Sequence, residues 1–327
     1  MERKDGRKPE AARKTRMTYE QLLEGEIGVV ADVVGFANSQ MTSIYADTTV
    51  VKSPEVVYRG VLSSRNRFIS EEYLLNFRRS RADMSQIIGV NNYRLPSVVQ
   101  SQACRRHKED PAKLVPLPKF GPMNEPIGPV IRSRRSFRDY SGRPIPLEQL
   151  ATILYHAQGI TGKMELRGIP KTVTFDDDDA LYVRAAPSGG GLYPISLYVF
   201  AMGVKDLERG AYRYVPEHHA LKRVARLDAD FDVNRLGQFG EMNAQAANAF
   251  VVFVYDLYAN SRKYGDSGMA YAFIEAGEIS GHVHLACTAL GLGACDIGGF
   301  SKSEIEALLG LDGLSRHAIH FLIIGNR

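Results

Sequence analysis

Four arginines and two serines lie within seven residues, in the run Arg132-Ser-Arg-Arg-Ser-Phe-Arg138. Adjacent guanidinium groups repel one another unless an anion neutralises them, and arginine binds phosphate through bidentate, charge-assisted hydrogen bonds. The run therefore suggests a phosphate site. The basic end of a surface helix would have the same composition, so the residues alone leave both interpretations open.

A glycine-rich loop follows in the stretch Ala186-Pro-Ser-Gly-Gly-Gly-Leu-Tyr-Pro194, directly before an apolar run. Consecutive glycines allow a ligand to approach the backbone and its N–H groups. The flanking Pro187 and Pro194 make the loop stiffer than a surface linker, which favours a ligand-binding loop. It matches neither the GxGxxG motif of dinucleotide-binding proteins nor the Gly-Lys-Ser/Thr of the P-loop.

Two further features could carry chemistry. The run Gly291-Leu-Gly-Ala-Cys-Asp-Ile-Gly-Gly-Phe300 offers glycine backbone against which a flat ring can pack. The pair Lys263-Tyr264 combines a cation with a phenol. Tyrosine, with an ordinary pKa of about 10, is a poor base at neutral pH unless a nearby cation favours its phenolate. Taken alone, the pair is explained more simply as two side chains of an exposed loop.

Hydrophobic periodicity predicts the elements that must position these residues. Pro144-Ile-Pro146 precedes an amphipathic helix over 147–158, which Gly159 ends. A long alanine-rich helix is expected over 269–290, buried because its small residues allow close packing. The other expected elements are strands at 197–202, 250–254 and 320–324, a helix from the capping box Ser301-Lys-Ser-Glu304 to Gly310, and helices beginning at Thr18 and spanning 71–79. Strands alternating with helices indicate an α+β or α/β domain.

Composition and charge divide the 327-residue chain into three regions. Residues 1–16 hold much of the net charge of +4 and are expected to form a disordered basic tail. No aromatic residue interleaves with those charges, so nucleic acid is not an expected partner. Residues 17–120 form an N-terminal extension, with a linker or extended arm at 106–129. Residues 121–327 form the main domain, which a long polar loop at 163–182 interrupts.

Cysteines and apolar segments indicate the setting. Cys104, Cys287 and Cys295 form no paired pattern, so neither a disulfide framework nor a zinc site is expected. The acidic run 176–179 lacks EF-hand spacing and is expected to be a solvated surface. The sequence contains no apolar run that could span a bilayer, and its start lacks the apolar region of a signal peptide. A cytoplasmic protein without a membrane segment is therefore expected.

Arg134-Arg-Ser-Phe-Arg-Asp-Tyr140 resembles the opening motif of the nitroreductase superfamily. The loop 186–194 resembles the form found in SagB-type dehydrogenases, which oxidise azoline rings to azoles in modified peptides. Further matching stretches follow in the expected order: Lys263-Tyr-Gly265, Tyr271, Glu275-Ala-Gly277, Leu290-Gly-Leu-Gly-Ala294, Ile297-Gly-Gly-Phe300 and Leu308-Leu-Gly-Leu-Asp-Gly313. Together these motifs are specific to the subfamily.

The resemblance implies an α+β, nitroreductase-like fold with a mostly antiparallel central sheet flanked by helices. It also implies an FMN-binding homodimer with two sites at the subunit interface. The implied contacts with the FMN phosphate and ribityl chain come from Arg134, Arg135, Ser136 and Arg138, with a last basic contact from Arg327. The implied flavin-lining residues are Pro187, Ser188, Gly189 and Gly190 of the other subunit, together with Ile297, Gly298 and Gly299.

Lys263 and Tyr264 match the catalytic Lys-Tyr pair of the azoline-oxidising members. Forming an azole requires the removal of a proton from one ring carbon and of a hydride from its neighbour. The resemblance implies that the flavin accepts the hydride, and the phenol beside the lysine is expected to take the proton. Molecular oxygen is the expected electron acceptor. A cyclodehydratase is an expected partner, docked on residues 17–120.

The chain departs from the subfamily pattern on the long helix. Members commonly carry Gly-His where this chain has Gly277-Glu278, and Gln-Asn where it has Gly281-His282. These differences put the usual substrate in question. His282 and His284 lie two residues apart and point to different faces of a helix, so a shared metal is not expected.

Two alternatives to azoline oxidation stay open. The first keeps the cofactor and changes the substrate, giving an FMN-dependent oxidase of a small molecule or an NAD(P)H-dependent reductase of nitro or quinone compounds. The Lys-Tyr pair distinguishes it from a peptide dehydrogenase. The second is a flavin-free scaffold subunit of a peptide-modifying complex. The arginine run argues against the scaffold, because its charges would then lack an anion.

Overall fold

The computed structural model describes Tyr73, residues 109–164 and residues 181–327. The chain divides into two units, Met1–Arg79 and Ser80–Arg327, and Tyr73 is the described part of the first. The predicted basic tail at 1–16 and the predicted helix from Thr18 lie outside the described residues. So do the predicted helix at 71–79, apart from Tyr73, which is helical, and most of the polar loop at 163–182.

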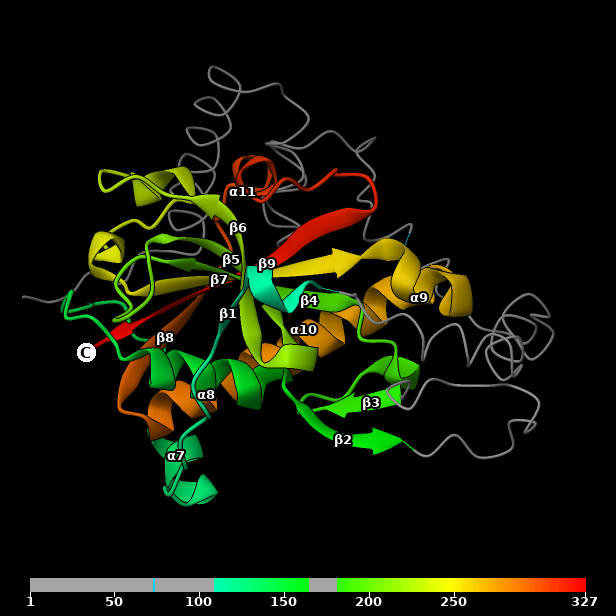
Figure 1. The fold of residues 1–327 in the computed structure, drawn as a ribbon, viewed down its shortest axis with the longest axis horizontal. Helices are drawn as coiled ribbons and strands as arrows, with labels where there is room; N and C mark the ends of the chain where they lie inside the picture. Colours follow the sequence, from blue (N-terminus) through cyan, green and yellow to red (C-terminus); the bar gives the residue numbers. More distant parts are fainter. Residues whose placement is uncertain (1–72, 74–108, 165–180) are drawn as a thin grey trace, which may run out of the picture. The chain divides into compact units, whose positions relative to one another are not determined.

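The second unit is built on a seven-stranded sheet with the order β1-β6-β5-β4-β7-β9-β8, in which every neighbouring pair is antiparallel (Figure 1). The strands are β1 (Leu114–Pro116), β4 (Ile195–Ala201), β5 (Gly210–Val215), β6 (Ala220–Arg226), β7 (Ala249–Asp256), β8 (Leu292–Ile297) and β9 (Arg316–Asn326). A separate antiparallel pair consists of β2 (Ile160–Met164) and β3 (Leu181–Arg184). The predicted α+β class with a mostly antiparallel central sheet is confirmed.

Helices flank the sheet. They are α7 (Ile127–Ser133), α8 (Leu147–Gln158), α9 (Leu257–Tyr264), α10 (Ser267–Ala289) and α11 (Lys302–Leu308). Short 3-10 helices are η1 (Pro111–Lys113), η2 (Gly189–Gly191), η3 (Pro216–His218), η4 (Val233–Arg235) and η5 (Ala244–Ala246). None of the helices in the described part of the chain combines the length and apolar character needed to cross a membrane.

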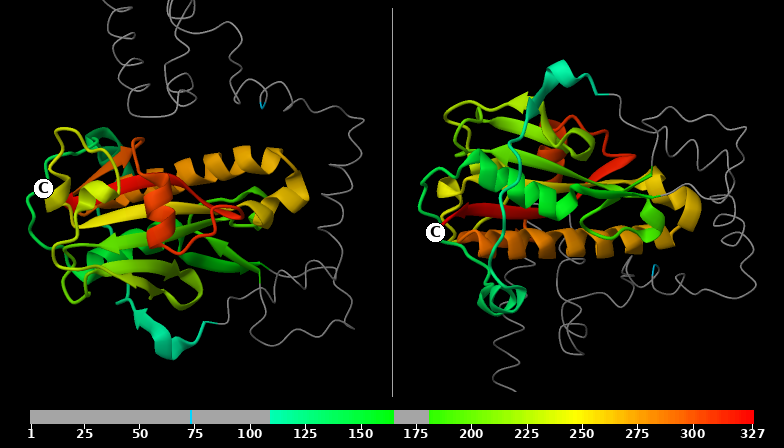
Figure 2. Two further views of the ribbon diagram at one scale, coloured as in Figure 1. Left: turned by 90° about the horizontal axis from the view of Figure 1, so that it is seen from above. Right: turned by 60° about the horizontal axis from the view of Figure 1, so that its bottom comes forward.

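Two hydrophobic clusters pack on opposite faces of the sheet. On one face, α8 and α10 lie side by side against apolar side chains of β4, β7 and β9 (Figure 2). On the other face, α11 and the segment 227–247 cover Phe250, Phe321 and Ile323. Side chains alternate between the faces along each strand, so neighbouring residues of β7 and β9 belong to different clusters. This double cover explains why β7 and β9 are buried along most of their length.

Several predicted elements agree with the structure. α8 spans the predicted residues 147–158, and Gly159 follows as its C-cap. The predicted strands lie within β4, β7 and β9 apart from Met202, which follows β4. α10 covers the predicted long helix apart from Leu290, which is its C-cap, and buries eleven of its 23 residues. α11 also forms, although the Ser301 side chain makes no capping hydrogen bond. The Glu304 side chain pairs with Arg235.

The stretch predicted as a linker or extended arm lies, in its described part, against the sheet and α8. β1 pairs with β6, and Glu109 forms ion pairs with Arg213 and Lys222. Farther along, the ring of Phe120 stacks on Tyr155 of α8 at a centroid distance of 3.6 Å. The sheet therefore includes residues before the predicted domain start at residue 121, and that boundary stays a prediction.

Candidate functional site

The arginine run lies beside β8, at one edge of the sheet. Ser136 forms a parallel bridge with Ala294, and the Phe137 N–H donates to the Ala294 carbonyl at 2.9 Å. The Tyr140 hydroxyl donates to the Phe137 carbonyl at 2.8 Å. These contacts hold the part of the run that follows α7 next to an outer strand of the sheet.

The guanidinium groups of this run have no described carboxylate as a partner. Arg135 Nη1 donates to the carbonyls of Arg132 and Arg134 at 2.8 and 2.7 Å, and Arg138 Nη1 donates to the Ser136 carbonyl at 3.4 Å. Within residues 109–164 and 181–327, no ion pair includes Arg132, Arg134, Arg135 or Arg138. Arg132, Arg135 and Arg138 are exposed and Arg134 is half-buried. A group of guanidinium ions without described counter-charges suits a phosphate or another multivalent anion.

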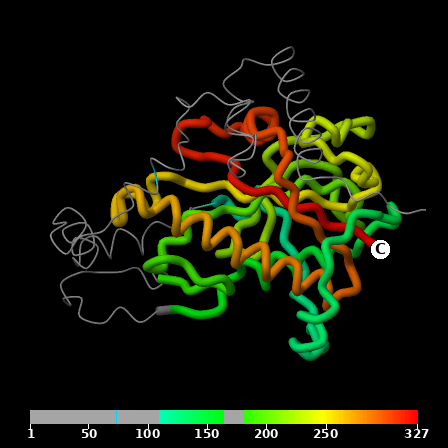
Figure 3. Tube along the Cα trace, turned by 180° about the vertical axis from the view of Figure 1, so that it is seen from behind, coloured from blue at the N-terminus to red at the C-terminus, as the bar shows by residue number. Residues whose placement is uncertain are grey.

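The carboxyl end of the chain lies next to the arginine run. Arg327 Nε donates to the Leu292 carbonyl at 3.1 Å, and its guanidinium lies 5.4 Å from the centre of the Phe137 ring. Arg143 Nη2 donates to the Arg327 carbonyl at 2.8 Å. The end of β9 therefore lies beside the segment that follows α7 (Figure 3). This arrangement places a further guanidinium in the neighbourhood of the run.

At the end of β8, the backbone of two glycines borders open space. Ile297 is buried, whereas Gly298 and Gly299 are exposed. A methyl group added at Gly298 would meet no described atom within 4 Å. Because β8 also pairs with the arginine run, one strand connects the predicted phosphate contacts with the predicted ring-flanking glycines. These residues fit a ligand that carries a phosphate at one end and a flat group at the other.

The predicted binding loop at 186–194 has a shape that depends on Ser188. The Ser188 hydroxyl donates to Glu275 Oε2 at 2.5 Å and accepts from the Tyr193 N–H at 2.9 Å. Gly190 and Gly191 have φ angles of 67° and 66°, and Tyr193 has a φ of 48°. Positive φ is costly for residues other than glycine. The loop is thus tightly turned and fixed to α10 through one serine.

Lys263 and Tyr264 meet at this loop. A Cβ atom added at Gly190 would lie 2.4 Å from both Lys263 Nζ and the Tyr264 hydroxyl oxygen, so the two atoms are separated by no more than twice that distance. The ammonium lies 5.2 Å from the centre of the Tyr264 ring, and Tyr271 packs edge-on against that ring at 5.0 Å. Both side chains are half-buried at the end of α9. The phenol and the cation therefore converge on the Gly190 backbone.

A buried carboxyl group supports the loop from α10. Glu275 is only 2% exposed, and its Oε1 atom has no hydrogen-bond partner among the described residues. Burial raises the pKa of Glu275 to about 7, although the hydrogen bond from Ser188 acts in the opposite direction. In the sequence, Glu275 stood out only as part of the matching stretch Glu275-Ala-Gly277. No sequence pattern indicated that its side chain is buried.

A second polar cluster, formed by Asp296, Ser280, His284 and His320, adjoins the end of β8. Asp296 Oδ1 accepts from Ser280 at 2.6 Å and from His320 Nε2 at 2.7 Å, and Oδ2 accepts from His284 Nε2 at 2.8 Å. Burial alone would raise the pKa of Asp296, but these hydrogen bonds outweigh it and hold the pKa well below its usual range. Sequence reasoning missed this cluster, because its members come from α10, β8 and β9.

Replacement of Asp296 by asparagine is expected to destabilise the protein by about 1–3 kcal/mol, because one amide oxygen cannot accept all three hydrogen bonds. His284, which is 5% exposed, would lose the partner of its Nε2 atom. Urea unfolding at pH 7 measures the change, with the exposed Asp230→Asn as the matched control. A free energy of unfolding within about 0.5 kcal/mol of the wild-type value would contradict a structural role for the cluster.

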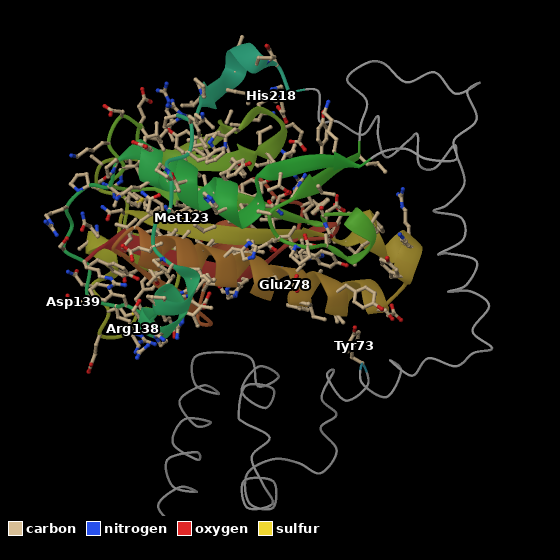
Figure 4. The ribbon with its side chains drawn as sticks, turned by 90° about the horizontal axis from the view of Figure 1, so that it is seen from below. Tyr73, Met123, Arg138, Asp139, His218 and Glu278 are labelled. Atoms are coloured by element: carbon tan, nitrogen blue, oxygen red, sulfur yellow. The ribbon has the colours of Figure 1, made fainter. Side chains whose placement is uncertain are left out.

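The structure collects the predicted site residues into two groups. Arg134, Arg135, Ser136, Arg138 and Arg327 lie around β8, whose end carries Ile297, Gly298 and Gly299. Pro187, Ser188, Gly189 and Gly190 lie with Lys263 and Tyr264 near the start of α10. No described hydrogen bond joins the groups. α10, with 23 residues, is about 34 Å long, and Arg138 lies well away from Glu278 of its middle turns (Figure 4).

The histidines of α10 are separated as predicted. His282 Nδ1 pairs with the His156 carbonyl at 3.0 Å, toward α8, whereas His284 faces Asp296 on β8. Within the described part of the chain, no group of three or more His, Cys, Asp or Glu side chains is arranged to hold a metal ion. Cys287 and Cys295 are free and buried.

Comparison with known proteins gives the family. A model of the nitroreductase family matches residues 131–325. A Methanocaldococcus jannaschii protein named as a nitroreductase is 32% identical over 180 residues, which are 55% of this chain and 82% of that protein. Among solved structures, one from Ralstonia eutropha, described as a nitroreductase, aligns with a TM-score of 0.50 and 23% identity, over 65% of this chain and 89% of its own.

A chain of the Escherichia coli microcin synthetase McbBCD complex, solved with truncated pro-MccB17 bound, also aligns with a TM-score of 0.50. Its identity is 16%, and the alignment covers 81% of this chain and 99% of the synthetase chain. Likeness at this identity concerns the fold. The family model covers more than half of the chain and includes the arginine run, both catalytic candidates and β8. The protein belongs to the nitroreductase family, a family of oxidoreductases.

Proposed function

We propose that the protein is an FMN-dependent dehydrogenase that converts azoline rings to azoles in a ribosomally made peptide. The observation that carries this proposal is the convergence of Lys263 and Tyr264 on the backbone of Gly190. A reductase that only exchanges hydride with its substrate needs no base at this position. Aromatisation of an azoline does need one, because a C–H proton must leave together with the hydride.

The donor set supports FMN as the cofactor. Arg134, Arg135, Ser136 and Arg138, with Arg327 beside them, would hold the phosphate and ribityl chain. Ile297, Gly298 and Gly299 would flank the ring system, where the backbone leaves open space. When bound, FMN supplies a two-electron acceptor for hydride, and molecular oxygen is the proposed final acceptor.

In the proposed reaction, the residues of this chain handle the proton. The Lys263 ammonium, close to the Tyr264 ring, favours the phenolate form of that side chain. The phenolate would take the proton from the azoline ring carbon that carries the peptide carbonyl group. Pro187, Ser188, Gly189 and Gly190 would hold the substrate ring and the cofactor against this base, because their loop is fixed by Ser188.

A homodimer would complete the site. The exposed side of α10 carries Phe273 and Ile274, which are 50% and 60% exposed, followed by Gly277 and Gly281. Small residues on a helix face allow a second helix to pack closely, and an uncovered apolar face is typical of an interface. Two copies joined through α10 would bring the glycine loop of one protomer to the arginine run of its partner. This arrangement accounts for the separation of the two groups within one chain.

Replacement of Ile274 by arginine is expected to convert the dimer to a monomer, because a charge would be buried in the interface. Analytical ultracentrifugation measures the mass, and FMN affinity should fall in parallel because each site would lose half of its residues. Val224→Arg, at an exposed apolar position on β6, is the matched control and should leave both properties unchanged. A wild-type monomer that binds FMN would overturn the dimer proposal.

A peptide substrate and a cyclodehydratase partner are part of the proposal. The alignment with a microcin synthetase chain extends over 81% of this chain, more than the span of the family model, and the complex that contains that chain was solved with truncated pro-MccB17 bound. Residues 17–120 are the proposed docking region. A second candidate, an NAD(P)H-dependent reductase of nitro or quinone compounds, is favoured by the relative named as a nitroreductase.

The test begins with the visible absorption spectrum of the purified protein and the identity of any group released on denaturation. A yellow protein that releases one FMN per chain is expected. Incubation with a thiazoline-containing peptide in air should then remove two hydrogens from each ring, as measured by mass spectrometry. A colourless protein that does not take up FMN would refute both enzyme candidates. Reduction of nitro compounds by NADPH, without azole formation, would select the second candidate.

A further inference from the structure

Glu275 is a buried carboxyl group of α10 that is hydrogen-bonded to the glycine loop. Its side chain is buried, one carboxyl oxygen has no described partner, and the other accepts a hydrogen bond from Ser188. The pKa of Glu275 is raised by burial above the value of an unfolded glutamate. The stability that this group contributes is therefore greatest at low pH and is lost as the pH rises toward about 7. Above about pH 7, this contribution is absent.

The hydrogen bond from Ser188 depends on the charge of Glu275. This bond lowers the pKa of the carboxyl, which means that it is stronger to the ionised form than to the protonated form. By linkage, ionisation must strengthen the bond to the same extent. Hydrogen bonds to a carboxylate are roughly twice as strong as bonds between neutral groups. The connection between α10 and the loop is therefore tighter when Glu275 is ionised.

Ser188 transmits this effect to the catalytic candidates. Its hydroxyl also accepts from the Tyr193 N–H, and its carbonyl accepts from the Gly191 N–H at 3.0 Å. These bonds close the turn that contains Gly190, against which Lys263 and Tyr264 lie. Tyr193 has a positive φ angle, which is costly for a residue other than glycine, so these bonds hold the end of the turn against local backbone preference.

We propose that Glu275 is a positioning residue that, when ionised, holds the glycine loop against Lys263 and Tyr264 through Ser188, and that loosens the loop when it takes up a proton. The inference deepens the proposed dehydrogenase function and rests on it for its catalytic consequence. The effect of Glu275 on the glycine loop itself does not depend on the proposed reaction. The loop is then held more tightly at slightly alkaline pH than at slightly acidic pH.

Two charged groups act on Glu275 from the elements around it. Arg184 of β3, which stacks on Tyr193 and pairs with Glu217, lowers the pKa of Glu275, whereas Glu278 of α10 raises it. The backbone of Ile195 at the start of β4 also favours the ionised form. Protonation below about pH 7 weakens the Ser188 bond, and deprotonation above it strengthens the bond again.

Hydrogen–deuterium exchange of the full chain between pH 6 and 8.5 tests the proposal, with rates corrected for intrinsic exchange. The peptide that contains residues 186–194 should gain about tenfold in protection as the pH rises through 7, the equivalent of one pKa unit. In Glu275→Gln, the protection should stay at the low-pH wild-type level throughout. The absence of a step in the wild type, or its persistence in Glu275→Gln, would overturn the proposal.

Two further variants keep the test decisive if Glu275→Gln does not fold. Ser188→Ala should lose the step and show low protection at every pH, whereas a retained step would overturn the role of Ser188. Glu278→Gln is the matched control on the same helix. It should keep the step and move its midpoint to lower pH, because Glu278 raises the pKa of Glu275.

The exchange experiment needs neither cofactor nor substrate, so it separates this proposal from the proposed function. If no ring oxidation is found, the step in exchange remains expected. If ring oxidation is found, kcat should fall below pH 7 with the same midpoint, and this limb should be absent in Glu275→Gln. Retention of the limb in that variant would refute the catalytic consequence.

Discussion

Replacement of Tyr264 by phenylalanine is expected to lower the rate of azoline oxidation by a factor of about 10²–10⁴, the usual contribution of a general base. The phenylalanine ring keeps the packing against Tyr271, whose ring lies edge-on at 5.0 Å. It removes only the hydroxyl that converges with Lys263 on Gly190. Mass spectrometry of a thiazoline-containing peptide, sampled over time, measures the rate.

The matched control is Tyr258→Phe on the same helix. Tyr258 is 52% exposed and lies at the opposite end of α9 from Tyr264. This variant should keep the wild-type rate, and both variants should keep the wild-type FMN content, because the proposed phosphate contacts lie around β8. Unchanged ring oxidation in Tyr264→Phe would remove Tyr264 from the mechanism. A parallel loss of FMN would indicate a role in the binding of the cofactor.

The elements that the sequence predicted best are those whose pattern matches their final environment. α8 combines a proline at its start, apolar residues on one face and a glycine at its end, and all three signals agree. β4, β7 and β9 are apolar on both faces because both faces of the sheet are covered, so they appear as continuous apolar runs. Local and tertiary preferences coincide in these segments.

The missed strands are those in which tertiary pairing overrides local preference. β6 has the sequence Ala-Leu-Lys-Arg-Val-Ala-Arg, which consists mainly of helix-favouring residues. It is a strand because it pairs with β5 on one side and β1 on the other. β8 contains glycine, alanine and cysteine and lacks the alternation of a half-buried strand, so no strand was predicted there.

The site could be predicted only in part for the same reason. The arginine run and the glycine loop are local motifs, and their composition suggested binding before any fold was considered. The meeting of Gly190 with Lys263 and Tyr264 joins segments more than seventy residues apart, which composition cannot reveal. Family resemblance supplied the importance of the Lys-Tyr pair. The burial of Glu275 and the bonding of Asp296 appear only in the folded chain.

Replacement of Gly190 by alanine is expected to reduce ring oxidation by about 100-fold, because a displacement of reacting groups by about 1 Å has that effect. The new methyl group would lie 2.4 Å from both Lys263 Nζ and the Tyr264 hydroxyl oxygen, which is too close for either atom to keep its position. The residue also has a φ of 67°, which costs alanine about 1–2 kcal/mol. Activity and stability should therefore both fall.

Gly191→Ala separates these two effects. Gly191 has a φ of 66°, so alanine there meets the same backbone penalty as at Gly190. A Cβ atom at Gly191, however, would meet no described atom within 4 Å. The two variants should thus show similar losses in the free energy of unfolding, measured in urea. Only Gly190→Ala should lose most of its kcat.

The comparison also tests whether the loop acts as a rigid support for the base. Equal losses of kcat in the two variants would mean that strain in the turn, and not contact with Lys263 and Tyr264, limits the reaction. Wild-type kcat in Gly190→Ala would mean that both side chains move aside without consequence, which contradicts a positioned base. Loss confined to Gly190→Ala requires the Lys263 and Tyr264 groups to occupy the space above Gly190 during turnover, as the proposed chemistry demands.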